Sequence, residues 1–456
     1  MSPSAITPMT AMPVIAPGET AQSMTERICD ITLREDKSVR TPLWWWIAFG
    51  LSLSLLGGGV VSVLWLFYAG LGIWGIDWPV AWGFDILNYV WWIAIASGGT
   101  FISALFFLLG VEWRTSLNRL AESLTLCAAL CAAIFPILHL GRPWFFYWLF
   151  PYPNTMGLWA QFRSPLVWDF FAILAYVLCS TLFWYFGLLP DFATLRDRAQ
   201  GRGQRVFYGI LAMGFRGSNR QWRHYRPVYA VTAALMAPLV VSVHSIVGMD
   251  FAGAAATGWH STQFPPFFVF GAALSGFAVV LLVLLPLRPL LGLQPYITAR
   301  HIDVLGRLLL TSSLCVTYAY IMDAFSTFYG PDQADRTMFL IRVSGLYAPV
   351  YWGTVILNGV LPQLFWWRSF RLNPVLTWLI CFGVLVGMWL ERFQIIVTSL
   401  ARTQLPSSWG QYTPTFWEWS LLFGTIGLFL TTFLLIVRLI PIVAMAEMRA
   451  MLRRPQ

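Results

Sequence analysis

A small set of ionisable side chains lies inside or beside long apolar stretches of this sequence, where proton transfer is the chemistry they favour. His139 and Asp169 belong to this set, and Asp250 follows another apolar stretch closely. A histidine beside a carboxylate in low-dielectric surroundings can accept a proton and pass it on, because burial and the opposite charge act on its proton affinity in opposite directions. Oxidation of a quinol needs this chemistry, since two hydroxyl protons leave as two electrons depart. The residues alone indicate this class of reaction and leave its substrate open.

Six further ionisable residues are candidates for the same site or for a proton path, namely Arg392, Glu391, Asp323, His244, Glu122 and Asp303. Ionisable side chains are costly within a bilayer, so we expect each of them to be paired or functional. Glu391 and Arg392 are neighbours, and neighbours on a helix point about 100° apart, so we expect that they do not fully satisfy each other. Glu122 and Asp303 lie towards the inner face, where helix ends also carry such groups for structural reasons. We expect no metal ligands.

Each leading candidate also has a purely structural interpretation. His139 lies at the end of its apolar stretch and could cap a helix. Asp169 lies one to two turns from Arg163 and could form an ion pair with it. Asp250, by its position, could be a solvated loop residue. These interpretations remain open from the sequence alone.

The composition places most of the chain in lipid. Its 456 residues are 58% hydrophobic and only 11% charged, whereas an ordinary soluble domain carries about 25% charged residues. The runs 51–72 and 271–285 lack charges, and a bilayer core of about 30 Å needs roughly 20 such residues per helix. A soluble enzyme, a nucleic-acid-binding protein and a disordered scaffold are therefore excluded.

The elements that must position these residues are apolar helices. We predict an N-terminal tail at 1–42 that lacks the features of a secretory signal, a transmembrane domain at 43–440 and a C-terminal tail at 441–456. The expected fold is an all-α polytopic membrane protein with about ten transmembrane helices. Its apolar segments are 43–72, 84–110, 119–140, 164–189, 227–247, 264–286, 305–329, 346–366, 373–397 and 416–440.

The basic residues predict the orientation of these helices. With both termini on the inner side, 23 of the 29 Lys and Arg residues lie in inner segments and five in outer loops. Loops rich in basic residues stay in the cytoplasm, so we predict that the N- and C-termini are both cytoplasmic. The net charge of +9 then reflects basic loops at the membrane edge and not a nucleic-acid surface.

A weak internal repeat relates the two halves of the chain. Small residues at 97–99 and at 275–276 allow close approach of helix backbones. Each patch is followed by an arginine-bearing turn and by a long segment with an ionisable residue near its outer end, His139 in one half and Asp323 in the other. Repeated halves place function near the interface between them.

Cofactor expectations follow from cysteine and histidine. The six cysteines include no C-x-x-C pair, so we expect no iron–sulfur cluster, zinc site or disulfide framework in this chain. His139 and His244 both approach the outer side, which leaves a membrane cytochrome b with a bis-histidine haem as an alternative function. A transporter or a pure membrane anchor is the other alternative, since ten helices with a weak repeat fit a transporter.

Several motifs resemble those of the polysulfide reductase NrfD-type membrane subunits. They are the small-residue patch 97–99, the segment 112–114, the run 135–143 with its His-Leu-Gly-Arg-Pro end, and the segment 163–169 that ends in an aspartate. The ten-helix form, the His-Leu-Gly-Arg-Pro turn and the run 388–393 are most similar to the ActC subunit of alternative complex III. The resemblance covers nearly all of the chain after about Trp44.

The resemblance implies two four-helix bundles, at about 84–247 and 264–397, flanked by the first and last helices. It implies a quinol site near the periplasmic face, lined by His139 and Asp169 with Asp250 as a third member. The quinol, expected to be menaquinol, is bound by a chain that itself holds no haem or iron–sulfur cluster.

The resemblance also implies partners and a location. Electrons are expected to pass to a periplasmic iron–sulfur protein subunit and then to a multihaem cytochrome c subunit. The complex also contains a second NrfD-like or other membrane subunit, and it lies in a bacterial cytoplasmic membrane as part of a respiratory or photosynthetic chain. Protons are released outside, and proton translocation has been proposed for family members.

Overall fold

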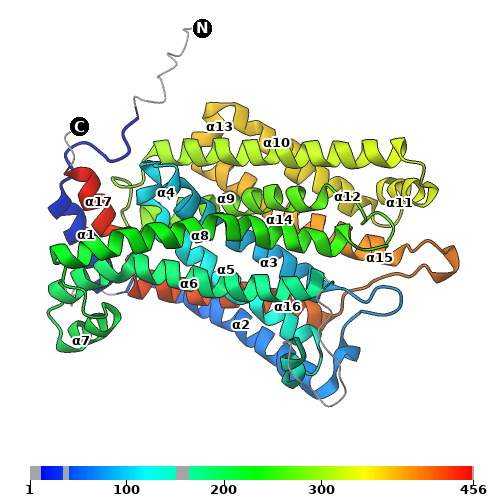
Figure 1. Cartoon of the computed structure of the whole chain (residues 1–456), viewed down its shortest axis with the longest axis horizontal. Coiled ribbons are helices and arrows are strands. Elements are labelled where there is room, and N and C mark those ends of the chain that lie inside the picture. The colour runs from blue at the N-terminus through cyan, green and yellow to red at the C-terminus, as the bar shows by residue number, and fades with distance from the viewer. Residues whose placement is uncertain (1–11, 34–40, 150–162, 164, 454–456) are drawn as a thin grey trace, which may run out of the picture.

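The structure is a computed structural model that describes residues 12–33, 41–149, 163 and 165–453 (Figure 1). Long helices run side by side along the longest axis of the molecule, with short helices and loops at both ends. Within the described ranges the chain forms helices and no β-strand, apart from one isolated bridge between Asp77 and Val80. The predicted all-α polytopic fold is confirmed.

Nine helices in the described part of the chain are long and apolar enough to cross a bilayer. A candidate for the tenth crossing consists of α12 (Ala348–Thr354) and the π- and 3₁₀-helical turns Val355–Val360 and Leu361–Trp366. It follows α11 (Gln333–Ser344) at a bend of 84°, so the predicted total of ten is reached when this bent pair counts as one span. The nine are α2 (Leu43–Ala69), α3 (Phe84–Thr100, continued by a π-helical turn and by α4, Phe106–Leu108), α5 (Asn118–His139), α6 (Pro165–Arg198), α8 (Asn219–Ala252), α9 (Phe264–Leu290), α10 (Ala299–Tyr329), α14 (Pro374–Phe393, continued by a π-helical turn and by α15, Ser399–Ala401) and α16 (Phe416–Leu439).

Several of these helices extend beyond the predicted apolar segments. Helix α6 continues to Arg198, and α8 begins eight residues before the predicted start at 227. Ser218 caps α8 by accepting a hydrogen bond from the Gln221 backbone N–H, and the Gln221 side chain reaches back to Ser218. Such polar ends lie outside the apolar pattern, so hydropathy alone does not detect them.

Short helices cover the end of the molecule that holds both termini. The predicted tail at 1–42 contains α1 (Ala21–Leu33), which buries Met24 and Ile28 and packs against α17 (Met445–Leu452). Helices α7 (Arg202–Leu211) and α13 (Arg368–Leu372) lie on connections between spans. Helices α1 and α17, the first and last helices of the described chain, lie together at one end of the molecule (Figure 1).

The spanning helices form two bundles, which meet where α9 packs against α3 and α8. Helices α3, α5, α6 and α8 make the first bundle, while α9, α10, α14 and the tenth crossing make the second. Helices α2 and α16 pack along each other, and α16 also packs against α5 at the side of the first bundle. Between the bundles, a Cβ atom on Gly98 or Gly276 would collide with the backbone of the other glycine. The two small-residue patches of the sequence therefore contact each other and bring α3 against α9.

Candidate functional site

The beginning of α3 carries two buried polar side chains, Asp85 and Tyr89, that sequence reasoning did not single out. They are four residues apart, so they lie on one face of the helix with Cβ atoms about 6 Å apart. Each side chain reaches a different helix and contacts one of the predicted site residues. The spacing of an acid and a tyrosine by one helical turn was the only sequence signal that could have found them.

His139, at the end of α5, contacts Asp85. Its Nδ1 faces Oδ2 of Asp85, while Oδ1 of the same carboxylate accepts a hydrogen bond of 3.1 Å from the Gly83 backbone N–H. The Asp85 side chain is 1% exposed and the His139 side chain 31% exposed, so the imidazole lies between the carboxylate and the surroundings. A negative charge is also favoured at the N-terminus of α3. The imidazole thus has a specific side-chain partner beyond any helix-capping role.

Asp169, near the start of α6, accepts a hydrogen bond of 2.5 Å at Oδ2 from the Tyr89 hydroxyl. The residue is 7% exposed, and its Oδ1 has no hydrogen-bond partner among the described residues. A hydroxyl is a neutral partner, unlike the Arg163 guanidinium of the structural interpretation. One carboxylate oxygen of Asp169 therefore remains available to a substrate or a water molecule.

Asp250 lies inside α8, which ends at Ala252, so its assignment to a loop was wrong. The helix continues here because the next side chain, Phe251, is buried and stacks against Phe268 with ring centroids 5.4 Å apart. The Asp250 carboxylate interacts electrostatically with Asp169, and its Oδ1 is buried without a hydrogen-bond partner in the described part of the chain. We call Asp85, Tyr89, His139, Asp169 and Asp250 the α3 site.

A second set of contacts fixes the start of α3. The Phe84 backbone N–H donates a 3.0 Å hydrogen bond to the Tyr412 hydroxyl, which donates in turn to Glu418 Oε1 at 2.5 Å. Glu418 also accepts from the Gly75 backbone N–H at 2.8 Å, which ties down the connection before α3. Burial and the Glu418 carboxylate raise the pKa of Tyr412, which keeps the hydroxyl protonated as a donor. The position of Asp85 is therefore set by the start of α16.

Glu391 and Arg392 form a buried ion pair in α14, with Oε1 and Nη1 2.7 Å apart. Neighbouring residues on a helix point about 100° apart, but both side chains are long enough to reach each other. As expected, the two side chains do not satisfy each other's hydrogen-bonding groups fully. Nε and both Nη atoms of Arg392 lack hydrogen-bond geometry to any described partner. The guanidinium instead lies 4.2 Å from the centroid of the Phe268 ring, and the Tyr320 hydroxyl donates to Glu391 Oε2. We call Tyr320, Glu391 and Arg392 the α14 cluster.

A small cavity of about 40 Å³ adjoins the α14 cluster. Asp323 in its wall lies 3.7 Å from Arg342 and accepts a hydrogen bond of 3.4 Å from Gln263. Tyr320, Glu391 and Gln394 complete the polar part of the lining, and Phe264 and Phe267 contribute aromatic surface. Asp323 thus lies beside the α14 cluster of the second bundle and not in the α3 site.

His244 lies deeper than its predicted position at the outer end of a span. Its Nε2 faces the Ser97 hydroxyl, and the residue is 1% exposed. Ser97 is about 18 Å along α3 from Asp85 at about 1.5 Å per residue, so His244 and His139 lie at different depths. One haem iron must bond both of its axial histidines directly, and these two positions do not fit that geometry.

The two inner candidates are paired with arginines. Glu122 lies 2.8 Å from Arg119 and accepts a 3.2 Å hydrogen bond from Tyr229. Asp303 lies 2.8 Å from Arg371 and 2.7 Å from Arg307. Each carboxylate therefore belongs to an ion pair at the end of its own bundle that is opposite the α3 site.

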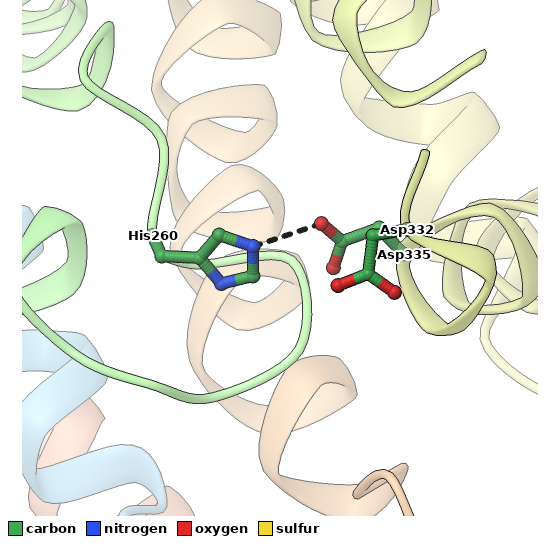
Figure 2. A group of neighbouring side chains, drawn as sticks. All are labelled: His260, Asp332 and Asp335. Atoms are coloured by element: carbon green, nitrogen blue, oxygen red, sulfur yellow. Dashed lines mark ion pairs between the residues drawn. The ribbon is translucent and has the colours of Figure 1, made fainter. Parts of the chain in front are cut away.

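An exposed group on the outer loops has the residue types of a metal site (Figure 2). The ligand atoms of His260, Asp332 and Asp335 lie within 4.8 Å of one another, and His260 forms an ion pair of 2.9 Å with Asp335. Asp332 also accepts from the Ala334 backbone N–H as the N-cap of α11, and Asp335 accepts from Gly258. The ion pair and the helix cap account for this arrangement without a cation.

The fold and the α3 site together define a multi-pass membrane protein with a histidine, a tyrosine and three carboxylates near one end of its spanning helices. The family model of polysulphide reductase NrfD matches residues 76–404, so the chain belongs to the NrfD family. The matched region runs from the connection before α3 to just past the end of α15, and it contains both the α3 site and the α14 cluster.

Two relatives are similar to this chain. The first is a protein of Halobacterium salinarum named as a membrane subunit of dimethyl sulfoxide reductase, 29% identical over 245 residues, or 51% of this chain and 52% of that protein. The match therefore spans about half the length of that relative. The second is a protein of Mesobacillus selenatarsenatis named as a subunit of selenate reductase, 22% identical over 401 residues, or 84% of this chain and 91% of that protein.

Proposed function

We propose that the chain is the quinol-binding and quinol-oxidising membrane subunit of a multisubunit quinol:electron-acceptor oxidoreductase. The observation that carries this proposal is the pairing of His139 with Asp85 and of Asp169 with Tyr89 on one turn of α3, beside Asp250. Membership in the NrfD family supports it, as do the names of both relatives, which describe subunits of reductases. A reductase consumes electrons, and quinol oxidation in the membrane supplies them.

In the proposed reaction the two hydroxyl protons of the quinol have separate acceptors. The half-exposed imidazole of His139 takes one proton, and the carboxylates of Asp169 and Asp250 take the other and release it outwards. Two O–H bonds break and the quinol becomes a quinone, and an iron–sulfur cluster of a partner subunit on the outer side would take up the two electrons. This chain contributes binding, orientation and proton acceptance, while the partner contributes the redox centre.

The motifs shared with the ActC subunit support a more specific assignment. We propose that the assembly is similar to alternative complex III in a bacterial cytoplasmic membrane, with menaquinol as substrate. Its partners are then a periplasmic iron–sulfur protein, a multihaem cytochrome c and a second NrfD-like membrane subunit. The names of the relatives favour a reductase module instead, so isolation of the complex and identification of its subunits decides between these assemblies.

The test uses the assembled complex in native membranes. We expect His139→Ala to slow quinol-dependent electron transfer by about 100-fold, because general acid–base groups contribute about 10²–10⁴-fold. The matched control is His224→Ala, since His224 is exposed at the opposite end of the first bundle, at the start of α8. A normal rate in the His139 variant overturns the proposal, and substrate uptake into vesicles without a redox partner favours the transporter alternative.

A second candidate function, proton translocation, is favoured by the α14 cluster and its cavity. Arg392 is buried with unsatisfied nitrogens, and the adjacent cavity reaches Asp323. The ion pairs of Glu122 and Asp303 then form the inner part of the route. Glu391→Gln tests it in vesicles: fewer protons moved per electron at an unchanged electron-transfer rate supports translocation, and an unchanged ratio rules out this route.

A further inference from the structure

We infer that Asp85 is a positioning residue that holds His139 in the tautomer whose Nε2 accepts the substrate proton. The inference rests on the proposed function, because it assigns a role within the same site. It adds a residue and a specific atom to that function. Its physical basis is the contact between the buried carboxylate and the half-exposed imidazole.

The contact between Asp85 and His139 determines which nitrogen of the imidazole carries the hydrogen. An ionised carboxylate only accepts hydrogen bonds, so Nδ1 of His139 must carry the hydrogen that lies between it and Oδ2 of Asp85. In the neutral ring the other nitrogen, Nε2, then has a free lone pair. Asp85 lies on the Nδ1 side and is almost fully buried, while the His139 side chain is 31% exposed. The ring nitrogen that does not face Asp85, Nε2, is thus the one that can accept a proton.

Asp85 itself is held in place by the start of α3. The Gly83 backbone N–H donates to Oδ1, and the N-terminus of α3 adds a favourable partial positive charge. The neighbouring Phe84 N–H is bound by Tyr412, so the turn that carries Asp85 is fixed from the start of α16. A Cβ on Gly83 would collide with the Tyr412 ring, which explains a glycine at this cap. The surrounding backbone therefore fixes the position of the Asp85 carboxylate, and the carboxylate in turn orients the His139 imidazole.

The discriminating variant is Asp85→Asn. A carboxamide can donate a hydrogen bond to Nδ1, which moves the ring hydrogen to Nε2 and removes the acceptor while the size of the side chain is kept. We expect turnover with quinol to fall by about 100-fold, as for loss of a general base, with KM almost unchanged. The control is Asp77→Asn on the preceding connection, where the carboxylate accepts from the Trp78 backbone N–H. We expect that variant to keep the normal rate.

Two further measurements separate positioning from a merely structural effect. In a double-mutant cycle, His139→Ala with Asp85→Asn should be no slower than His139→Ala alone, because Asp85 acts through the imidazole. Nitrogen-15 spectra of the histidine-labelled complex report the tautomer directly. The His139→Ala spectrum identifies the His139 signal by its loss.

The expected spectra show hydrogen on Nδ1 of His139 in the natural protein and on Nε2 in Asp85→Asn. A tautomer that is the same in both proteins, or additive rate losses in the cycle, overturns the inference and leaves the proposed function intact. Normal turnover in His139→Ala overturns the proposed function instead, whatever the tautomer. The two failures are therefore distinguishable.

Discussion

The two bundles each contain a polar group in their outer half, yet the partners of the acids differ. In the α3 site, Asp169 accepts from a neutral tyrosine and Asp85 contacts a histidine. In the α14 cluster, Glu391 contacts Arg392, and nearby Asp323 lies 3.7 Å from Arg342. An arginine holds its partner carboxylate in the charged form, because a guanidinium does not give up its proton.

This difference favours the α3 site as the acceptor of the substrate protons, whereas Glu391 of the α14 cluster must give up its ion pair with Arg392 before it can carry a proton. A carboxylate beside a hydroxyl, or a histidine beside a carboxylate, has two accessible protonation states. Side-chain exposure also favours the α3 site as the proton acceptor, since His139 is half-buried whereas both members of the Glu391–Arg392 pair are fully buried. We therefore assign quinol oxidation to the first bundle and expect the four changes below to affect the bundles differently.

The largest effect should come from Arg392→Met, which leaves Glu391 buried without its cation. Breaking one side of a buried ion pair costs about 3–5 kcal/mol, so we expect a large loss of thermal stability in detergent. The control is Arg198→Met, whose partner Glu26 is 3.7 Å away and exposed. Equal stability of the two variants would show that the ion pair between Glu391 and Arg392 does not stabilise the protein.

Asp169→Asn should affect activity more than stability. The change keeps the shape of the side chain but removes a proton acceptor, so we expect quinol oxidation to slow by about 100-fold. Asp197→Asn, an exposed acid at the far end of α6, is the control. The assay is electron transfer from a quinol in the assembled complex. An activity near normal would mean that Asp169 is a structural residue.

Tyr89→Phe should have an intermediate effect. Removing the hydroxyl frees one oxygen of Asp169, and a hydrogen bond to a charged group contributes about 1.5–3 kcal/mol. We expect turnover to fall by roughly tenfold, the equivalent of about 1.4 kcal/mol. Tyr185→Phe serves for comparison, because its hydroxyl donates to the Leu211 carbonyl at the inner end. Similar rates in the two variants would remove Tyr89 from the site.

Asp323→Asn should have the smallest effect. Its side chain is 28% exposed and lies 3.7 Å from Arg342, in the second bundle and outside the α3 site. We expect quinol oxidation within about twofold of the normal rate, corresponding to less than about 0.5 kcal/mol. A loss as large as that of Asp169→Asn would move the substrate site to the second bundle.

The number of spans was predictable because charges are scarce in the apolar helices and leave clear boundaries. The polar ends of α6 and α8 were not, since they extend beyond the bilayer and carry no hydropathy signal. The helix α1 within the N-terminal tail was missed because a short helix depends on tertiary contacts, here with α17. Orientation in the membrane remains a prediction from the basic residues.

His139, Asp169 and Asp250 could be selected from sequence because ionisable groups stand out among apolar residues. The structure brings them to one place, although their roles remain proposals. Asp85 was not selected from the sequence because acidic residues are common at the start of helices. Tyr89 was not selected because an aromatic residue in an apolar segment indicates only packing. The depth of His244 depends on which helix face meets Ser97, and this is a tertiary property.

The most direct test of the central claim locates the substrate. A photoreactive quinone analogue can be crosslinked to the assembled complex, with excess quinol as competitor, and the labelled peptides identified by mass spectrometry. We predict competable labelling of the start of α3, the end of α5 and the start of α6, around Asp85, His139 and Asp169. Competable labelling confined to α10 and α14, around Tyr320 and Glu391, would contradict the assignment of quinol oxidation to the first bundle.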